Sequence, residues 1–378
     1  MKVAGSMLAT IPRQRTPWWA WLLAVSFLAI FANLLRNSLM GFEGPGAATS
    51  DASGGGILIE EVAPGKPMEK AGVHAGDIVV AIDGQAIRNG HDSGEMAWQY
   101  EPGKPFVLTV VRDSQQMQLT LRFPERRLWE LRDRKQWLDY FQSEALALLY
   151  LACGLVTLFA RPRDPGAVAG AFLLLMFGGL LGPGSGVGTA ALFRQLPFLL
   201  QVPMFLFATL LGGYLVLVFA ALYPRPVFRR RWILPVLLVP ALLGILYNAV
   251  RFYHRFYMPA QAISPGPPWA FQLGLAVEMA NILAGLIVLA LGYKRLKAAH
   301  ERRRLRRVLF SALISFGAMV VYFWMLSWEP SSRVLRQAYH SDATGFAFLA
   351  LWSVFPVVFA QTVLRTGSRS AGTIADSQ

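Results

Sequence analysis

Few residues in this sequence have the spacing that covalent chemistry needs. Zinc-dependent proteolysis requires His-Glu-x-x-His on one helix face, because two histidines hold the metal and the glutamate acts as the general base. The one His-Glu pair is His300-Glu301, and Arg304 stands where the second histidine belongs. The five histidines share no ligand spacing. We therefore expect no metal site and no cofactor.

A serine nucleophile is also hard to place. An intramembrane serine protease needs Gly-x-Ser-Gly in a helix, together with a distant histidine. In the run 182–186, Gly-Pro-Gly-Ser-Gly, Pro183 stands where the first glycine belongs. Glycine and proline in such a run are typical of a helix end or a kink. We expect that the chain is not an enzyme and has no catalytic residues.

Three polar residues lie within otherwise apolar runs, namely Glu278, Asn281 and Asn248. An ionised carboxylate is costly in hydrocarbon, so Glu278 should face other protein groups and be either paired or protonated. Asn281 follows one helical turn later on the same helix face. Two interpretations of Glu278 stay open: a ligand or proton site, and a neutral hydrogen bond that ties two helices together.

The runs that position these residues indicate a membrane protein. Hydrophobic residues make up 54% of the chain and charged residues 15%. Apolar blocks of about 20 residues recur, which is the length that crosses a bilayer. The predicted fold class is a polytopic α-helical membrane protein of about eight transmembrane helices with an inserted α+β domain. The predicted spans are residues 18–35, 140–160, 167–181, 196–222, 232–250, 269–292, 308–328 and 345–364.

Positive charge predicts the orientation of these spans. The positive-inside rule places residues 1–17 and 365–378 in the cytoplasm and residues 51–124 outside the plasma membrane. A juxtamembrane helix, 125–139, then leads into a bundle of seven helices over 140–364. The densest basic run should lie against anionic lipid at the cytoplasmic leaflet. It contains Lys294, Arg295, Lys297, Arg302, Arg303, Arg304, Arg306 and Arg307.

Residues 51–124 differ in sequence pattern from the rest of the chain, and this pattern predicts a small α+β domain. Asp83-Gly84 follows an apolar run and is a strong signal for a two-residue hairpin turn. Phe106–Arg112 and Gln116–Phe123 alternate in strand fashion around Asp113-Ser114, which predicts a second hairpin.

The run GILIEEVAPGKPMEKAGVHAGDIVVAIDGQAI, residues 56–87, resembles a bacterial PDZ domain in its turns and glycines. PDZ domains bind an extended peptide by adding it to the edge of a strand. The resemblance implies that Gly54, Gly55, Gly56 and Ile57 offer backbone N–H groups to a carboxylate. It also implies that Leu58 and Ile59 pair with the peptide. A folded spacer or dimerisation module is the alternative.

The whole arrangement resembles the membrane half of bacterial PDZ-containing sensor histidine kinases and serine phosphatases, without the effector domain. The stretches that carry this resemblance are 161–165, 301–306 and 355–360. It implies a non-enzymatic sensor or adaptor that binds an extracytoplasmic peptide or protein and couples to a separate cytoplasmic signalling partner. The alternatives are a small-molecule or ion transporter that uses Glu278, and a membrane scaffold that displays the PDZ module. No nucleic acid partner is expected.

Overall fold

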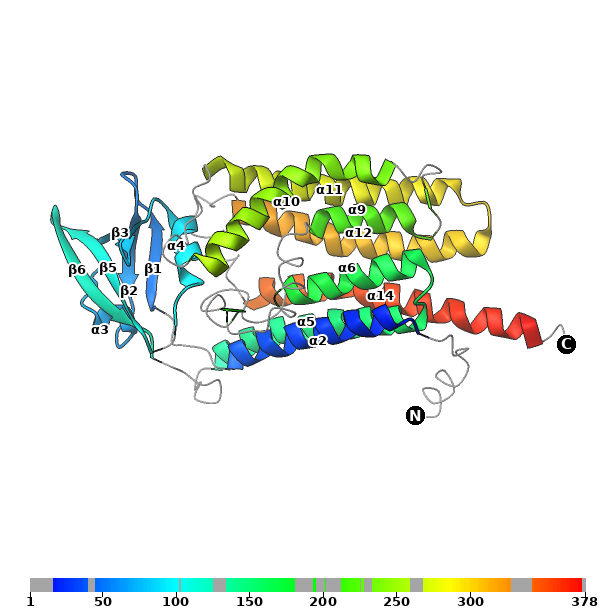
Figure 1. The fold of residues 1–378 in the computed structure, drawn as a ribbon, viewed down its shortest axis with the longest axis horizontal. Coiled ribbons are helices and arrows are strands. Elements are labelled where there is room, and N and C mark those ends of the chain that lie inside the picture. The colour runs from blue at the N-terminus through cyan, green and yellow to red at the C-terminus, as the bar shows by residue number, and fades with distance from the viewer. Residues whose placement is uncertain are drawn as a thin grey trace.

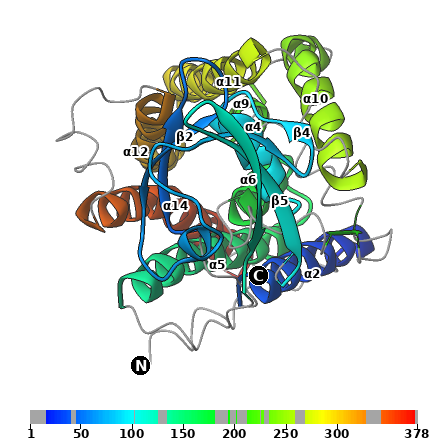
Figure 2. The same ribbon diagram turned by 90° about the vertical axis from the view of Figure 1, so that its left-hand side faces the viewer.

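A β-sheet domain sits at one end of an elongated helical body (Figure 1). The computed structural model describes residues 16–39, 45–101, 103–124, 134–180, 193–194, 201, 212–224, 226–227, 233–258, 268–327 and 342–375. The start of α2 (Trp18–Leu39) and the end of α14 (Asp342–Ala375) lie at the end of the body far from the sheet. Seen from the sheet's end, the helices form a ring behind it (Figure 2).

The sheet has six strands in the order β1-β2-β3-β5-β6, with β4 paired to β3, and the pairings are antiparallel. Two short helices, α3 (Pro67–Lys70) and α4 (Gly90–Ala97), complete the domain. The buried side chains of one sheet face, among them Ile59, Leu108 and Leu121, form its core. The strands are β1 (Ala47–Asp51), β2 (Ile57–Val62), β3 (Ile78–Ile82), β4 (Gln85–Ala86), β5 (Pro105–Arg112) and β6 (Gln115–Arg122).

Both predicted hairpins are confirmed. The turn residues Asp83 and Gly84 have φ values of 46° and 76°, and Asp113 and Ser114 have 49° and 64°. Positive φ at both central residues is the geometry of a type I′ turn, whose twist matches that of the strands it joins. These turns place β3 against β4 and β5 against β6.

Gly56 is required by the close approach of two strands. Its φ is +93°, and a Cβ atom at this position would lie 2.7 Å from the carbonyl oxygen of Val79 on β3. Gly54, two residues earlier, has open space around it and no positive φ. The two glycines therefore have different roles, although they stand in the same Gly-Gly-Gly run.

The helical body is held together by buried aromatic side chains. The helices are α2, α5 (Arg134–Ala160), α6 (Pro165–Leu180), α9 (Gly212–Leu222), α10 (Ile233–Tyr257), α11 (Pro268–Arg295), α12 (Ala299–Ser327) and α14. Phe219 of α9 packs edge-on against Phe359 of α14, with ring centroids 5.1 Å apart. Phe316 of α12 meets Phe355 of α14 at 5.0 Å. Burying each such ring stabilises the fold by about 1.5–3 kcal/mol.

Pro356 interrupts the hydrogen bonding of α14, and neighbouring helices compensate. A proline has no N–H, so the carbonyl of Trp352 loses its helical donor. The hydroxyl of Tyr150 on α5 donates to that carbonyl at 2.9 Å. Ser315 of α12 accepts from the N–H of Phe355 at 3.0 Å and donates to the carbonyl of Leu351 at 2.7 Å. Three helices are therefore joined at the proline.

The prediction of about eight transmembrane helices is wrong. Among the described residues two helices are long and apolar enough to cross a bilayer, over Ala276–Arg295 and Ala347–Arg365. The apolar parts of α2, α5, α6 and α9 are 10–17 residues long, which is short of the roughly 20 that a span needs. Arg251, His254 and Arg255 in the second half of α10, and the charged first turns of α12, shorten those runs as well. Parts of the predicted spans 167–181, 196–222 and 308–328 lie outside the described residues.

We expect Gly56→Ala to destabilise the sheet domain by about 2 kcal/mol, because it combines a strained φ with a clash against backbone. Hydrogen exchange in β2 and β3 of the full-length protein should accelerate by about 30-fold, since 1.4 kcal/mol corresponds to tenfold. Gly54→Ala is the matched control and should leave exchange unchanged. Equal exchange rates in the two variants would contradict this role of Gly56.

Candidate peptide-binding groove

β1 is an edge strand. It pairs with β2 and with no other described strand, while β2 is flanked by both β1 and β3. An edge strand presents a row of backbone N–H and C=O groups that an incoming strand can use. The edge open to strand addition at this side of the sheet is therefore that of β1.

A cavity of about 170 Å³ lies beside this edge, between the sheet and α4. Ala47 and Thr49 contribute to it from β1, and Ser93 and Ala97 from α4. Most of the remaining lining is apolar and comes from the core face of the sheet. Those residues include Ile57, Ile59, Val79, Ile82, Phe106 and Leu108. The cavity can accept an apolar side chain of a peptide that runs along β1.

Three aromatic rings in mutual contact line one side of the cavity. Tyr100 lies parallel to Phe106 with centroids 4.4 Å apart, and Phe123 lies 5.4 Å from Tyr100. Burial raises the pKa of Tyr100, so its side chain is a neutral phenol at physiological pH. This wall therefore carries no charge that would oppose an apolar ligand.

α4 is fixed in position at its first turn. Asn89 caps the helix by accepting from the N–H of Asp92, and Asp51 at the end of β1 accepts from the N–H of Gly90 at 2.6 Å. Asp92 is 1% exposed and accepts from the guanidinium of Arg88 at 2.7 and 2.9 Å. These bonds set the spacing between α4 and β1, and hence the width of the groove.

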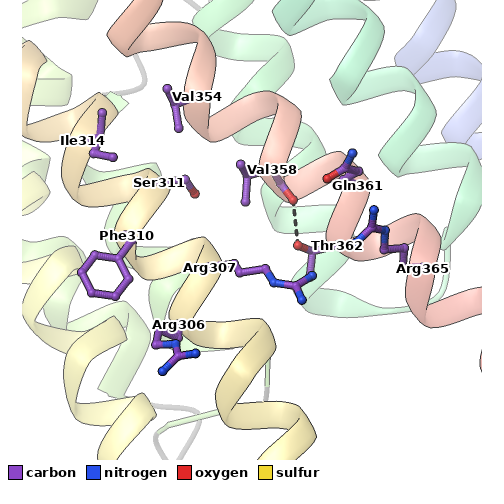
Figure 3. A pocket seen from close by; sticks show the side chains of 10 residues that line it. All are labelled: Arg306, Arg307, Phe310, Ser311, Ile314, Val354, Val358, Gln361, Thr362 and Arg365. Atoms are coloured by element: carbon purple, nitrogen blue, oxygen red, sulfur yellow. Dashed lines mark hydrogen bonds between the residues drawn. The ribbon is translucent and has the colours of Figure 1, made fainter.

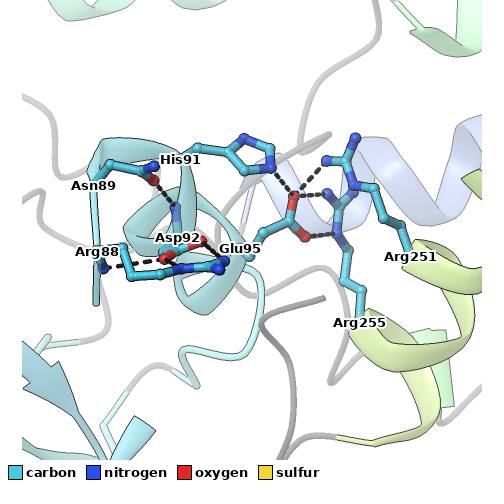
Figure 4. Close-up of polar contacts among 7 residues, drawn as sticks. All are labelled: Arg88, Asn89, His91, Asp92, Glu95, Arg251 and Arg255. Atoms are coloured by element: carbon cyan, nitrogen blue, oxygen red, sulfur yellow. Dashed lines mark hydrogen bonds and ion pairs between the residues drawn. The ribbon is translucent and has the colours of Figure 1, made fainter. Parts of the chain in front are cut away.

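The opposite face of α4 docks on the helical body through Glu95 (Figure 4). The Glu95 carboxylate accepts from the guanidinium of Arg255 on α10, with Nε at 2.8 Å, and also pairs with Arg251 one turn earlier. His91 lies 3.7 Å from the same carboxylate. Glu95 is 3% exposed, so this is a buried ion pair between the groove helix and the body.

Aromatic contacts extend the same interface. The Arg255 guanidinium lies 4.1 Å from the ring centre of Trp98, which meets Phe256 edge-on at 5.9 Å. A cation over an indole ring is attracted by its electron-rich face. Gln99 donates to the backbone carbonyl of Arg255 and accepts from Arg194 at 3.0 Å. Charge, stacking and hydrogen bonds therefore hold the groove helix against α10.

The pKa values of Glu95 and of the neighbouring His91 are both lowered in this interface. Burial by itself would raise the pKa of Glu95, but hydrogen bonds and charge from Arg255 and Arg251 outweigh it and hold the pKa below its ordinary value of 4.5. Burial and then the charge of Arg251 lower the pKa of His91 below 6.5. At neutral pH the site therefore holds an ionised Glu95 beside a neutral imidazole.

The residues predicted for peptide binding do not lie on the free edge of the sheet. The N–H of Gly55 donates to Ala52, that of Gly56 to Arg88, and that of Ile59 to Asp77. Ile57 and Leu58 pair with both β1 and β3. These donors are occupied, so strand addition at 57–59 has no free edge, and Gly54–Gly56 form a turn rather than a carboxylate cradle. β1 was missed because Ala47-Ala48-Thr49-Ser50-Asp51 has no apolar alternation.

Glu278 is a helix-tying residue in this structure. Its carboxylate accepts from the N–H of Gly213 in the first turn of α9, a position where a negative group offsets the helix dipole. A Cβ at Gly213 would lie 2.3 Å from the Glu278 carbonyl oxygen, so only glycine lets α9 approach this closely. Asn281 is buried on the same helix, and Asn248 lies on α10.

The predicted basic residues flank the turn from α11 to α12. Lys294 and Arg295 end α11, and Arg302, Arg303, Arg304, Arg306 and Arg307 follow in the first turns of α12. Arg295 donates to the carbonyl of Val227, and Arg302 lies 5.3 Å from the ring centre of Tyr293. This turn lies at the end of the body far from the sheet domain (Figure 1). Their predicted contact with lipid stays a prediction.

Comparison with known proteins identifies the sheet domain. The model of the PDZ domain family matches residues 40–122. The chain is 36% identical over 66 residues to the putative serine protease HhoA of Synechocystis sp., covering 18% of this chain and 17% of that protein. It is 26% identical over 106 residues to the putative serine protease HhoB of the same organism, covering 27% of this chain and 25% of that protein. The chain thus spans a quarter or less of these relatives.

Solved structures give a similar likeness. The HtrA-type protease AlgW with a decapeptide matches 22% of this chain and 30% of its own, at 22% identity and a TM-score of 0.21. A Ser-to-Ala form of AlgW with a decapeptide matches 26% and 33%, at 20% identity and a TM-score of 0.24. Scores this low carry no argument of their own.

These findings correct the functional predictions. The chain contains a PDZ domain, a module that binds peptides, and the relatives are described as putative serine proteases. The prediction of a non-enzymatic sensor or adaptor is therefore wrong, and the likeness to the membrane half of sensor kinases and phosphatases finds no support. This prediction relied on the lack of familiar catalytic motifs, whereas the similarity to putative serine proteases accompanies a PDZ domain.

Docking of α4 on α10 should weaken on acidification. Because docking lowers the pKa of both His91 and Glu95, the undocked state binds more protons, and acid favours it. Docking should be constant above pH 6.5, weaken below it as His91 titrates, and weaken further below 4.5 as Glu95 titrates. Spin labels at Glu60 and Leu246, in a Cys153→Ser background, would report the docked distance.

Two variants separate the two groups. His91→Gln should remove the step that begins near pH 6.5 and keep the lower one. Glu95→Gln should lose the docked distance even at pH 7, because breaking a buried ion pair costs about 3–5 kcal/mol. Glu61→Gln, on the exposed part of β2, is the matched control. A docked distance that survives in Glu95→Gln would refute the assigned interface.

Proposed function

We propose that the chain recognises extended peptides for proteolysis, binding them along β1 with one apolar side chain in the cavity beside α4. The observation that carries this proposal is the free edge of β1 next to a cavity of about 170 Å³ lined by apolar residues. Main-chain hydrogen bonds to β1 would give affinity, and the cavity would give preference for an apolar residue. The serine-protease relatives support proteolysis as the purpose of that recognition.

We also propose that the helical body lies in a plasma membrane, crossed by α11 and α14, with the PDZ domain on its outer side. α11 buries Ile282, Leu286 and Leu289 against its neighbours. Its other face exposes further large apolar side chains at helical spacing: Leu283, Ile287 and Leu291. A helix that is apolar on both its packed and its exposed face is better suited to lipid than to water. The peptides would then be extracytoplasmic.

Strand addition makes a specific demand on the peptide. In an extended peptide alternate N–H groups point toward the strand that it joins. N-methylation at alternate positions of a bound peptide should therefore weaken binding to the full-length protein at least tenfold, while methylation at the positions between them should have little effect. Fluorescence anisotropy with labelled peptides would measure both. A uniform small loss at every position would argue against addition to β1.

Filling the cavity supplies the matching change in the protein. Ala97→Leu places a larger side chain in the cavity and should weaken peptide binding at least tenfold. Gly94→Leu adds a leucine to the same helix at a position with open space and should bind as the parent does. Equal affinities in these two variants would show that the peptide binds elsewhere.

Proteolysis needs its own test. The full-length protein, purified from membranes with whatever it retains, should react with a fluorophosphonate probe for activated serines. Labelling of a 41.8 kDa band would place the nucleophile in this chain. Labelling of a retained partner would make this chain its recognition component. Absence of labelling in preparations that bind peptide would contradict the proteolytic part of the proposal.

A further inference from the structure

A second groove lies between α12 and α14, away from the PDZ domain (Figure 3). Its volume is about 300 Å³. α12 contributes residues at i, i+1, i+4, i+5 and i+8 from Arg306, and α14 contributes residues at i, i+4, i+7, i+8 and i+11 from Val354. Each set lies on one helix face, so the groove is a continuous furrow between two neighbouring helices.

The two ends of this furrow differ in chemistry. Arg306, Arg307 and Arg365 lie toward one end, and Gln361 lies on α14 near Arg365 (Figure 3). Phe310, Ile314, Val354 and Val358 line the rest. The eight residue steps from Arg306 to Ile314 span about 12 Å of helix. A cationic end therefore leads directly into an apolar trough of that length.

The polar groups of the floor are already used within the helices. Ser311 donates to the carbonyl of Val308 at 2.9 Å, and Thr362 donates to that of Val358 at 2.7 Å. Both hydroxyls are buried, at 2% and 5% exposure. The ten lining residues include three arginines and no carboxylate. The lining at this end of the groove is therefore positively charged.

We propose that this groove binds one anionic glycerophospholipid, with the headgroup phosphate at the three arginines and an acyl chain along the apolar trough. Guanidinium groups bind phosphate through paired N–H donors, and the phosphate's charge offsets theirs. The trough shields the part of the acyl chain next to the headgroup from the surrounding lipid. α12 begins at the end of the body far from the PDZ domain, so the lipid comes from the leaflet opposite that domain (Figure 1).

This inference rests on the proposed placement of the body in a membrane, and the two can fail separately. Resistance of the protein to alkaline carbonate extraction tests the placement, and peptide anisotropy tests the PDZ groove. Neither measurement depends on the arginines. If the protein is extracted by carbonate, the membrane proposal falls, and the lipid site falls with it. If it resists extraction but binds lipid without preference, the lipid site alone is refuted.

Native mass spectrometry of the full-length protein in detergent would count bound lipid. The parent should retain one phosphatidylglycerol and prefer it at least tenfold over phosphatidylcholine. Changing Arg306, Arg307 and Arg365 together to Gln should reduce that binding at least tenfold. Ile314→Trp, which fills the trough, should also reduce it. The control for a single change, Arg306→Gln, is Arg303→Gln, which removes one positive charge from α12 outside the groove and should bind lipid as the parent does.

Three further outcomes would overturn the proposal. If Arg303→Gln loses as much binding as a single change at Arg306, the effect is general surface charge. If glycerol phosphate, which has no acyl chain, competes as well as phosphatidylglycerol, the site is one for soluble anions. If diacylglycerol, which has no phosphate, binds equally well, the arginines do not select the ligand.

Discussion

The carboxylate of Glu95 between Arg255 and Arg251 is the contact on which the arrangement of the two parts depends. It removes three charges from water, and it is stable only because the partners satisfy one another. Since Glu95 lies on the same short helix as Ser93 and Ala97, the ion pair also holds one wall of the peptide groove. The position of that wall therefore depends on the helical body and not on the PDZ domain alone.

This coupling limits what a peptide can do on binding. If a peptide enters between β1 and α4 and moves α4, the movement must act on Glu95, Trp98 and Gln99, which contact α10. If α4 does not move, the groove is preorganised and the cost of binding is lower. In either case the groove and the body are linked by these side chains.

Turn chemistry made the PDZ domain predictable from sequence. Asp83-Gly84 and Asp113-Ser114 take positive φ at both positions, as a type I′ turn requires, and so set the two hairpins. β1 was not predictable from its own residues, because small polar side chains at an edge carry no hydrophobic alternation. Nor could a local pattern pair Glu95 with Arg255, which is 160 residues away.

The number of membrane spans was overpredicted for a related reason. An apolar run indicates that its side chains are removed from water, but it does not indicate whether protein or lipid surrounds them. The runs of α6 and α9 are packed inside the helical body by Phe177 and Phe219, and their described parts are shorter than the roughly 20 residues that a span needs. α11 and α14 are longer, and α11 exposes apolar side chains on its outer face. Length and exposed face together separate the two cases.

The central claim is that a peptide lies between β1 and α4, and photo-crosslinking tests it most directly. A bound peptide that carries a diazirine side chain should label β1, over Ala47–Asp51, and the groove face of α4 at Ser93 and Ala97 in the full-length protein. Peptide mapping by mass spectrometry would locate the labelled residues. Labelling confined to Gly54–Ile59, or to the helical body, would contradict the account.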